Sequence, residues 1–484
     1  MRSNSILKNA ALYSSLIILS IVIYAFIEKS KIPLLLSVYV LILEFIISLR
    51  ILGYRGLSLD PLKDGRFYFV ALIFLYSVWV PIIALLTHFS GTGFSALNTY
   101  GAIKYTIEDV LRCNIGSCFL FLGIICGLYL KKFAFDWQLT VGGERLTSVQ
   151  MATKRKVKGW FIISAISTLF FLMPFLKGGF QIIQNGGTIL DVESSASLYS
   201  GNPIMTILGF FFSPEVMAIS TIALIYYLSN CKDIPIKRKY YFIFLIFVFH
   251  SLVAIYTTRS ARFVLILLAT IAIIVSNEEM RRNIRFKRFI IIIAILLLGT
   301  FLIDYLITEK HVTGKFGSEL WLIEVLRNFD GIGPYDAYLK AINEMADYHM
   351  FSNVVYSFFS PIPALGKYVI NLLGFTGNGS PLYLWMFDHY HNIYSIGGGL
   401  AYLPQIEAYI SAGQLGMVLY GFVYGTIFGR RKSGLLNYIV IAFSLMLARG
   451  SLGVIASLFW PYIFICYFLY DNVLLRESSL ETRE

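Results

Sequence analysis

The sequence predicts an all-α polytopic membrane protein with about twelve transmembrane helices and one large external loop. The chain of 484 residues is 57% hydrophobic with a mean hydropathy of +0.71, more apolar surface than a soluble domain of this size can use. Its apolar residues form continuous stretches of about 17–25 residues, the length of a membrane-spanning helix, whereas a transmembrane β-barrel needs alternation. The basic residues gather in connections on one side of the predicted membrane.

Hydropathy places each span in turn. The first follows Arg2 and Lys8 and has no small-residue cleavage site, so we expect a retained span rather than a signal peptide. Nine spans fall within residues 1–307, an external loop occupies 308–401, and three spans with a short cytoplasmic tail occupy 402–484. The predicted spans are 11–27, 33–49, 67–86, 110–130, 160–176, 204–228, 240–258, 263–276, 289–307, 402–428, 435–449 and 452–470.

Charge sets the orientation of these spans. With the N-terminus inside, 27 of the 40 lysines and arginines lie on the inner side. Four separate inner loops each carry a basic cluster, at 154–158, 237–239, 281–288 and 430–432. This agreement predicts that both termini are cytoplasmic.

Composition also excludes several classes of function. The net charge of +12 would suggest nucleic acid in a soluble protein, but here anionic membrane lipids and the positive-inside rule account for it, so no nucleic-acid partner is expected. No soluble nucleotide-binding pattern is present. The cysteines form no CxxC pair and predict neither a metal site nor a disulfide framework; they are Cys113, Cys118, Cys126, Cys231 and Cys466.

The external loop 308–401 is too long for a passive connection and has its own apolar and aromatic residues, among them Trp321, Tyr356 and Trp385. We therefore expect a compact helical cap that lies partly on the membrane.

Four arginines fall on the outer side, where the positive-inside rule disfavours them. Arg259 and Arg262 are three residues apart at the start of the span 263–276, and two guanidiniums on one helix face can grip adjacent phosphates. Arg449 ends another span, and Arg327 lies in the external loop near Asp330. They predict a pyrophosphate site; membrane anchoring, or for Arg327 an ion pair with Asp330, is the alternative.

Two residues are candidates for acid–base catalysis. Glu407 lies one or two turns inside the span 402–428, where a carboxylate must find a partner, line a wet cavity or be protonated. His391, in Asp388-His389-Tyr390-His391-Asn392, precedes the glycines at 397–399 and titrates near neutral pH. A structural ion pair remains open for Glu407.

Four further residues are weaker candidates for a functional role. His250, well inside a span, is expected to be a hydrogen-bonded core residue, and Glu44 is expected to snorkel from the inner end of its span. Asp191 and Glu193 are one acidic pair in an outer loop, and no metal or other cofactor is predicted.

In these features the chain resembles the O-antigen and capsular polysaccharide repeat-unit polymerases of the Wzy type. The resemblance rests on a dozen spans with one large external loop, on the outer segment Thr258-Arg259-Ser260-Ala261-Arg262, and on residues 397–425. The last of these combines a glycine-rich start, Glu407, the motif Gly413-Gln414-Leu415-Gly416 and the glycines 421 and 425. Ala412 and Gln414 stand where the family pattern has an aromatic–glycine pair.

The resemblance implies a GT-C-like membrane glycosyltransferase in the bacterial cytoplasmic membrane, with an active site that faces outward. Its substrate would be oligosaccharide linked to undecaprenyl pyrophosphate, used without a cofactor and with inversion, and a chain-length regulator protein is a further expected partner. His391-Asn392 is similar to the external loop of O-antigen ligases, so a ligase stays open. A flippase for lipid-linked oligosaccharide is the alternative from another class.

Overall fold

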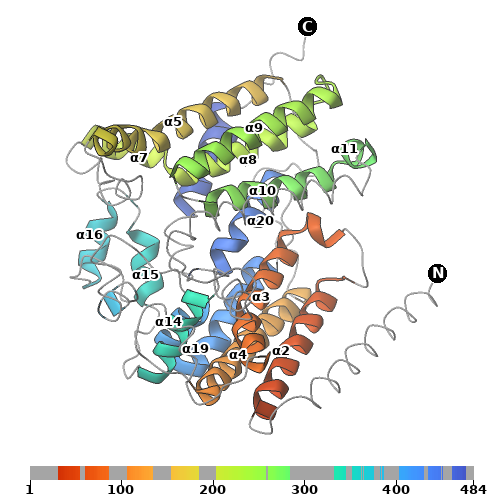
Figure 1. The fold of residues 1–484 in the computed structure, drawn as a ribbon, viewed down its shortest axis with the longest axis vertical. Helices are drawn as coiled ribbons and strands as arrows, with labels where there is room; N and C mark the ends of the chain where they lie inside the picture. Colours follow the sequence, from red (N-terminus) through yellow and green to blue (C-terminus); the bar gives the residue numbers. More distant parts are fainter. Residues whose placement is uncertain are drawn as a thin grey trace.

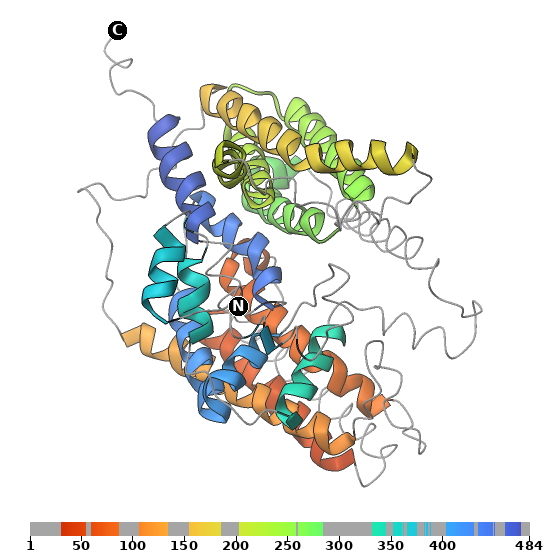
Figure 2. The same cartoon turned by 90° about the vertical axis from the view of Figure 1, so that its left-hand side faces the viewer.

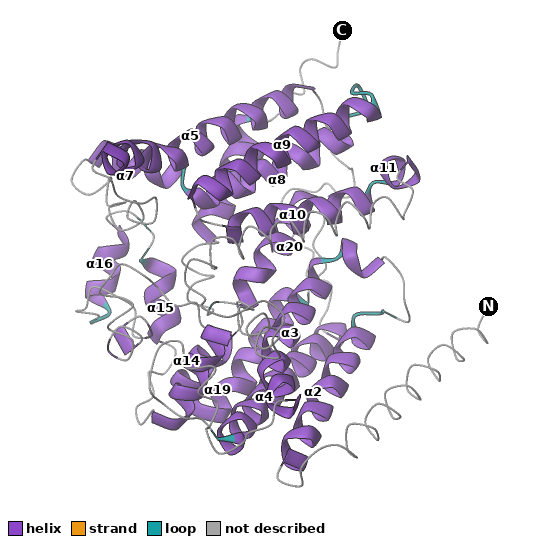
Figure 3. Cartoon of the chain, in the orientation of Figure 1, coloured by secondary structure: helices purple, strands orange, loops and turns teal. Residues whose placement is uncertain are grey.

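The structure is a computed structural model that describes residues 31–54, 60–86, 106–133, 154–184, 203–257, 260–283, 332–344, 352–360, 362, 365–374, 382, 384–385, 388, 403–429, 434–448, 450 and 460–475. Across these ranges the chain forms helices joined by turns, and no strand is present (Figure 3). Six helical segments of the described part are long and apolar enough to cross a membrane, at Ile32–Ile51, Gly65–Leu85, Ile107–Leu130, Lys154–Met173, Ile207–Asn230 and Pro404–Phe428. The predicted all-α, multi-span class is confirmed at this level.

A first group of helices lies in the lower part of Figure 1. It contains α2 (Ile32–Ile51), α3 (Gly65–Leu86), α4 (Ile107–Phe133) and α19 (Pro404–Phe428). Within it α4 packs against both α2 and α19, and α2 packs against α3. The short helix α14 (Ile332–Glu344), from the predicted external loop, packs on α4 and α19.

A second group lies above the first in both views (Figures 1 and 2). It contains α5 (Lys154–Gln184), α7 (Pro203–Phe211), α8 (Pro214–Asn230), α9 (Ile236–Thr257) and α10 (Ser260–Ser276), followed by α11 (Glu278–Asn283). The helix α20 (Gly434–Ala448) packs on α3 of the first group and on α10 of the second, and so joins the two.

Large apolar side chains are exposed along several of these helices, as expected where lipid is the solvent. Examples are Leu36 of α2 (60% exposed), Leu169 of α5 (62%) and Phe244 of α9 (64%). A soluble protein would not leave such stripes uncovered, so these faces support a membrane location.

One predicted span contains a turn. The predicted span 204–228 corresponds to the membrane-spanning segment Ile207–Asn230, within which the chain leaves the helix at Phe212 and Ser213 and resumes in α8. The Ser213 hydroxyl accepts a hydrogen bond from the amide of Val216 (3.2 Å), and Pro214 takes the first helical position. A serine cap followed by proline is a strong start signal, and here it prevails over apolar continuity.

The other predicted spans agree with helices wherever they are described. The spans 33–49, 67–86, 110–130, 160–176 and 402–428 correspond to α2, α3, α4, α5 and α19, and 240–258, 263–276 and 435–449 correspond to α9, α10 and α20. Residues 11–27 and 289–307 lie outside the described part. Only the second half of 452–470 is described, as a helix that continues into the π-helix η3 (Phe464–Leu474).

Glycines bring α4 and α19 into close contact. A Cβ added to Gly123 of α4 would lie 3.0 Å from the Cα of Gly421, and one added to Gly127 would lie 2.9 Å from the Cα of Gly425. Each of these Cβ atoms would also collide with a backbone carbonyl oxygen of the facing helix. The two small-xxx-small pairs therefore let the backbones approach at a distance that no larger residue permits.

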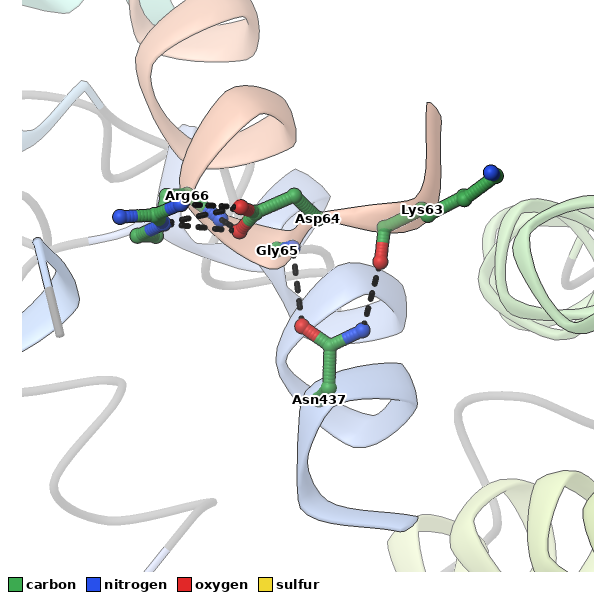
Figure 4. Close-up of polar contacts among 5 residues, drawn as sticks. All are labelled: Lys63, Asp64, Gly65, Arg66 and Asn437. Carbon is green, nitrogen blue, oxygen red and sulfur yellow. Dashed lines mark hydrogen bonds and ion pairs between the residues drawn. The ribbon is translucent and has the colours of Figure 1, made fainter. Parts of the chain in front are cut away.

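The start of α3 is fixed by polar contacts with α20, shown in Figure 4. The side chain of Asn437 accepts a hydrogen bond from the amide of Gly65 (3.1 Å) and donates one to the carbonyl of Lys63 (2.8 Å). Asp64 caps α3 by accepting from the amide of Arg66 (3.0 Å), and the Arg66 guanidinium pairs with the same carboxylate (Nε to Oδ2, 2.9 Å). The turn Lys63–Gly65 is thus held by Asn437 from α20 and by Arg66 from the first turn of α3.

A buried carboxylate anchors the last described helix to the second group. Asp471, on η3, accepts hydrogen bonds from the hydroxyl of Tyr227 on α8 (2.6 Å) and the indole of Trp160 on α5 (3.2 Å). The ammonium group of Lys156 lies 3.5 Å from the same oxygen, Oδ1. Because these three partners are two hydrogen-bond donors and a cation, they compensate the carboxylate charge inside the protein.

Candidate functional site

Glu407 is buried in the first turn of α19. Pro404 takes the first helical position after Leu403, which starts the helix without a side-chain cap. Glu407 follows three residues later and is 0% exposed. A carboxylate buried at the start of an apolar helix requires a donor or a proton.

Asn353 supplies that donor from the predicted external loop. It is the second residue of α15 (Ser352–Phe359), is 2% exposed, and donates a hydrogen bond from Nδ2 to Oε1 of Glu407. Its Oδ1 accepts a hydrogen bond from the amide of Leu382 (3.1 Å). One side chain therefore joins α15, the segment at Leu382 and α19.

α19 is broken five residues after Glu407. Ala412 (φ −162°, ψ 33°) and Gly413 (φ 61°, ψ −141°) leave helical geometry, so the helix continues in a new direction from Gln414. The conformation of Gly413 is open essentially to glycine. A Cβ added to Gly416 would collide with the carbonyl of Ala408, which shows how closely the two halves approach.

Hydroxyl groups bridge this break. The Ser411 hydroxyl donates to the carbonyl of Glu407 (2.7 Å), and the hydroxyls of Ser411 and Tyr420 share a hydrogen bond of 2.9 Å. Tyr420 belongs to the second half of α19, so the bond links the halves across Ala412 and Gly413. These bonds hold the break in one geometry beside Glu407.

Gln405, two residues before Glu407 in α19, is buried and contacts two neighbouring helices. Gln405 donates to the hydroxyls of Ser77 on α3 (2.6 Å) and Ser117 on α4 (3.4 Å). Gln405 Oε1 and the hydroxyl of Tyr335 on α14 are buried and have no hydrogen-bond partner among the described residues. Buried polar atoms without partners are uncommon in folded proteins.

The helix α14, from the predicted external loop, packs on α4 and α19. The hydroxyl of Tyr338 donates to the carbonyl of Cys113 on α4 (2.9 Å). It occupies the space that a side chain at Gly116 would need. Tyr335 and Tyr338 are both 0% exposed and meet edge to face, with ring centroids 5.7 Å apart. Part of the predicted cap is therefore packed into the helix bundle.

The predicted cationic residues are only partly described. Arg262 lies in the first turn of α10, so the expected helix start there is confirmed, but its side chain lies outside the description. Arg259, Arg327, Arg449 and His391 lie outside the described residues. Their grouping into a pyrophosphate site with Glu407 stays a prediction.

Several weaker candidates are placed. His250 is buried and shares a hydrogen bond of 3.2 Å with the hydroxyl of Thr221, as expected for a core histidine. Glu44 is half-buried and its Oε2 is buried, so this oxygen does not reach the surface as snorkelling would require. Asp388 is exposed, and Asp191 and Glu193 lie outside the described residues.

Among the described residues, no three His, Cys, Asp or Glu side chains lie close enough together to hold a metal ion. The five cysteines are free thiols.

Comparison with known proteins adds no relative. The chain matches no protein-family model, no curated protein and no solved structure. The site must therefore be interpreted from its own residues.

Sequence reasoning found Glu407 but missed the residues around it. Asn353, Ser411, Tyr420 and Gln405 carry no motif, and Asn353 is 54 positions from its partner. Of these four, only Ser411 could have been suspected from the sequence, because it lies one helical turn after Glu407 and two residues before Gly413.

Proposed function

We propose that this protein polymerises oligosaccharide repeat units linked to undecaprenyl pyrophosphate at the outer face of the bacterial cytoplasmic membrane. The observation that carries the proposal is the buried Glu407, placed at the start of an apolar helix and held by Asn353 from the predicted external loop. A carboxylate held where a membrane span meets an external segment suits a base that acts on a lipid-linked substrate at the membrane surface.

In the proposed reaction, a hydroxyl at the non-reducing end of one lipid-linked repeat attacks the anomeric carbon of the growing chain. The new glycosidic C–O bond forms while the bond to the pyrophosphate breaks, and undecaprenyl pyrophosphate leaves. The proton of the attacking hydroxyl passes to Glu407, or to His391 as the other predicted base. A single displacement of this kind inverts the anomeric centre.

The departing pyrophosphate needs positive charge, and the predicted outer arginines can supply it without a metal ion. These are Arg259, Arg262, Arg327 and Arg449. Guanidinium groups suit this role because each can bind two phosphate oxygens at once.

One observation favours a second candidate. A helix broken inside an apolar segment, as α19 is at Ala412 and Gly413, is typical of transporters whose binding sites lie at the unwound region. A flippase for the same lipid-linked oligosaccharide is therefore the competing proposal.

The two functions differ in what a deletion strain displays. A gel of surface polysaccharide from a strain without this gene should show a single band of lipid core plus one repeat if the protein is a polymerase, with a ladder restored on complementation. Complete loss of attached repeats would contradict the polymerase. Single lipid-linked repeats would then indicate a flippase, and accumulated long lipid-linked chains a ligase.

Complementation with Glu407→Gln tests the site. We expect normal expression and no ladder, because glutamine keeps the shape but accepts no proton. Glu108→Gln makes the same chemical change at an exposed residue of α4 that pairs with Arg112, and should restore the full ladder. A normal ladder with Glu407→Gln would remove Glu407 from the mechanism.

A further inference from the structure

We propose that Asn353 is a positioning residue that holds Glu407 in its reactive geometry only while α15 is docked on α19. This inference rests on the proposed function, because it assigns Asn353 a role in the same reaction. Its evidence is the bridge in which one asparagine side chain contacts both Glu407 and the amide of Leu382.

The second contact fixes which way the amide of Asn353 faces. The backbone amide of Leu382 can only donate, so the atom that faces it must be the oxygen Oδ1. The nitrogen Nδ2 must then face Glu407, where it can only donate. The orientation of an asparagine amide is otherwise ambiguous, and here the hydrogen bonds determine it.

Asn353 donates to Oε1 of Glu407 and neither gives nor takes a proton in the proposed reaction. Its role is to hold the carboxylate plane, so that the base keeps one orientation throughout the reaction.

α15 is also fixed at its other end. The indole of Trp460 donates to the carbonyl of Phe358 (2.7 Å), and the rings of Trp460 and Phe358 stack with centroids 5.1 Å apart. Asn353 and Ser357 form the buried face of this helix, while Val355 and Phe358 are exposed on the other. A short helix tied at both ends can hold a base steadily, and it reaches the base through Asn353.

The first test compares Asn353 with a neighbour on the same buried face. Purified protein in nanodiscs would act on lipid-linked glycan extracted from the strain that lacks this gene. We expect Asn353→Ala to lower kcat about 10- to 100-fold with KM changed less than about twofold, since substrate contacts remain. The control Ser357→Ala should stay within about twofold of wild type. A kcat for Asn353→Ala equal to that of the control would overturn the inference.

The second test uses charge. In Asn353→Asp, the new carboxylate still accepts from the amide of Leu382 but faces the carboxylate of Glu407. Two adjacent carboxylates retain a shared proton to higher pH, so the acid limb of the pH–rate profile should move up by about one unit or more. Because a purely structural role would lower activity equally at all pH values, an unshifted profile would sink the inference.

A double variant separates this inference from the proposed function. Combining Asn353→Asp with Glu407→Gln restores a donor–acceptor pair with reversed polarity. We expect it to recover the melting temperature lost in Asn353→Asp, while activity stays absent. Activity in Glu407→Gln alone would remove Glu407 from the mechanism, leave His391 as the predicted base, and overturn this inference. The proposed polymerase function itself would fail only if the deletion strain lost all attached repeats. An inactive Glu407→Gln together with an unshifted Asn353→Asp profile would overturn the inference alone.

Discussion

Gly123 of α4 and Gly421 of α19 lie face to face, and a Cβ on either residue would come within 3.0 Å of the other's Cα. The same relationship recurs one turn along between Gly127 and Gly425. Since lipid offers little hydrophobic force to drive two helices together, this close backbone packing is a main source of their association.

Substitution at this crossing should therefore be severe. We expect Gly421→Leu to destabilise the protein by more than about 3 kcal/mol, because the new side chain meets backbone atoms that cannot move aside. Leu419→Ala, at a partly exposed position of the same helix, should change stability by less than about 1 kcal/mol. Melting in detergent, followed by size-exclusion chromatography, measures both. Equal melting temperatures would show that the helices do not approach closely.

The break in α19 depends on Gly413. At φ 61° and ψ −141°, alanine would be strained, so Gly413→Ala should cost about 1–3 kcal/mol or force α19 to straighten. Straightening would displace Glu407 from Asn353, so activity should fall together with stability. Leu415→Ala, an exposed neighbour, is the matched control. If Gly413→Ala left activity and melting temperature unchanged, α19 would not be broken at this position.

Asp64 should make the start of α3 sensitive to acid. Burial raises the pKa of Asp64, but the hydrogen bonds and charge of Arg66 outweigh it, so the net pKa lies below its usual value. The stabilisation is then fully present above the unfolded pKa of about 3.9 and is lost as pH falls through the folded pKa.

Asp64→Asn should remove this dependence. The variant should melt below wild type at pH 7, and the difference should shrink as the pH falls below about 4. Melting curves over a pH series measure this. Glu108→Gln, whose ion pair with Arg112 is exposed, should show little change at any pH. A constant difference between Asp64→Asn and wild type would mean that the carboxylate charge is not the stabilising feature.

Arg262 tests the predicted pyrophosphate site independently of Glu407. We expect Arg262→Ala to abolish the polysaccharide ladder while expression and membrane insertion stay normal, since the residue stands at the first turn of α10. The loss should correspond to at least about 100-fold in rate, as for other residues that stabilise charge in a transition state. Arg238→Ala, at an exposed arginine of α9, should keep the ladder. Normal chain length in Arg262→Ala would remove it from the site.

Hydropathy predicted most of the described fold because length and apolarity decide which segments cross a bilayer. Hydropathy also located the apolar segment around Ser213 and Pro214, but it did not locate the helix start there that divides the segment into α7 and α8. It also failed at Gly413, because glycine is common in transmembrane helices and does not by itself mark a break.

The candidate site was less predictable than the fold. A carboxylate inside an apolar segment is rare and therefore conspicuous, so Glu407 could be singled out from the sequence alone. Its partner could not, since an asparagine in a long loop has no pattern that relates it to a residue 54 positions later. The buried Asp471 was missed for the same reason: its partners Tyr227 and Trp160 come from two distant helices.

The glycine crossing also has a consequence for biosynthesis. Gly123 and Gly421 are separated by about 300 residues, and at a synthesis rate of about 5–20 residues per second the ribosome needs roughly 15–60 s to pass from one to the other. During that time α4 resides in the bilayer with its glycine face against lipid or a transient neighbour. The contact between α4 and α19 is therefore among the last that the nascent chain can make, and a chain truncated before α19 would leave this face of α4 without its native partner.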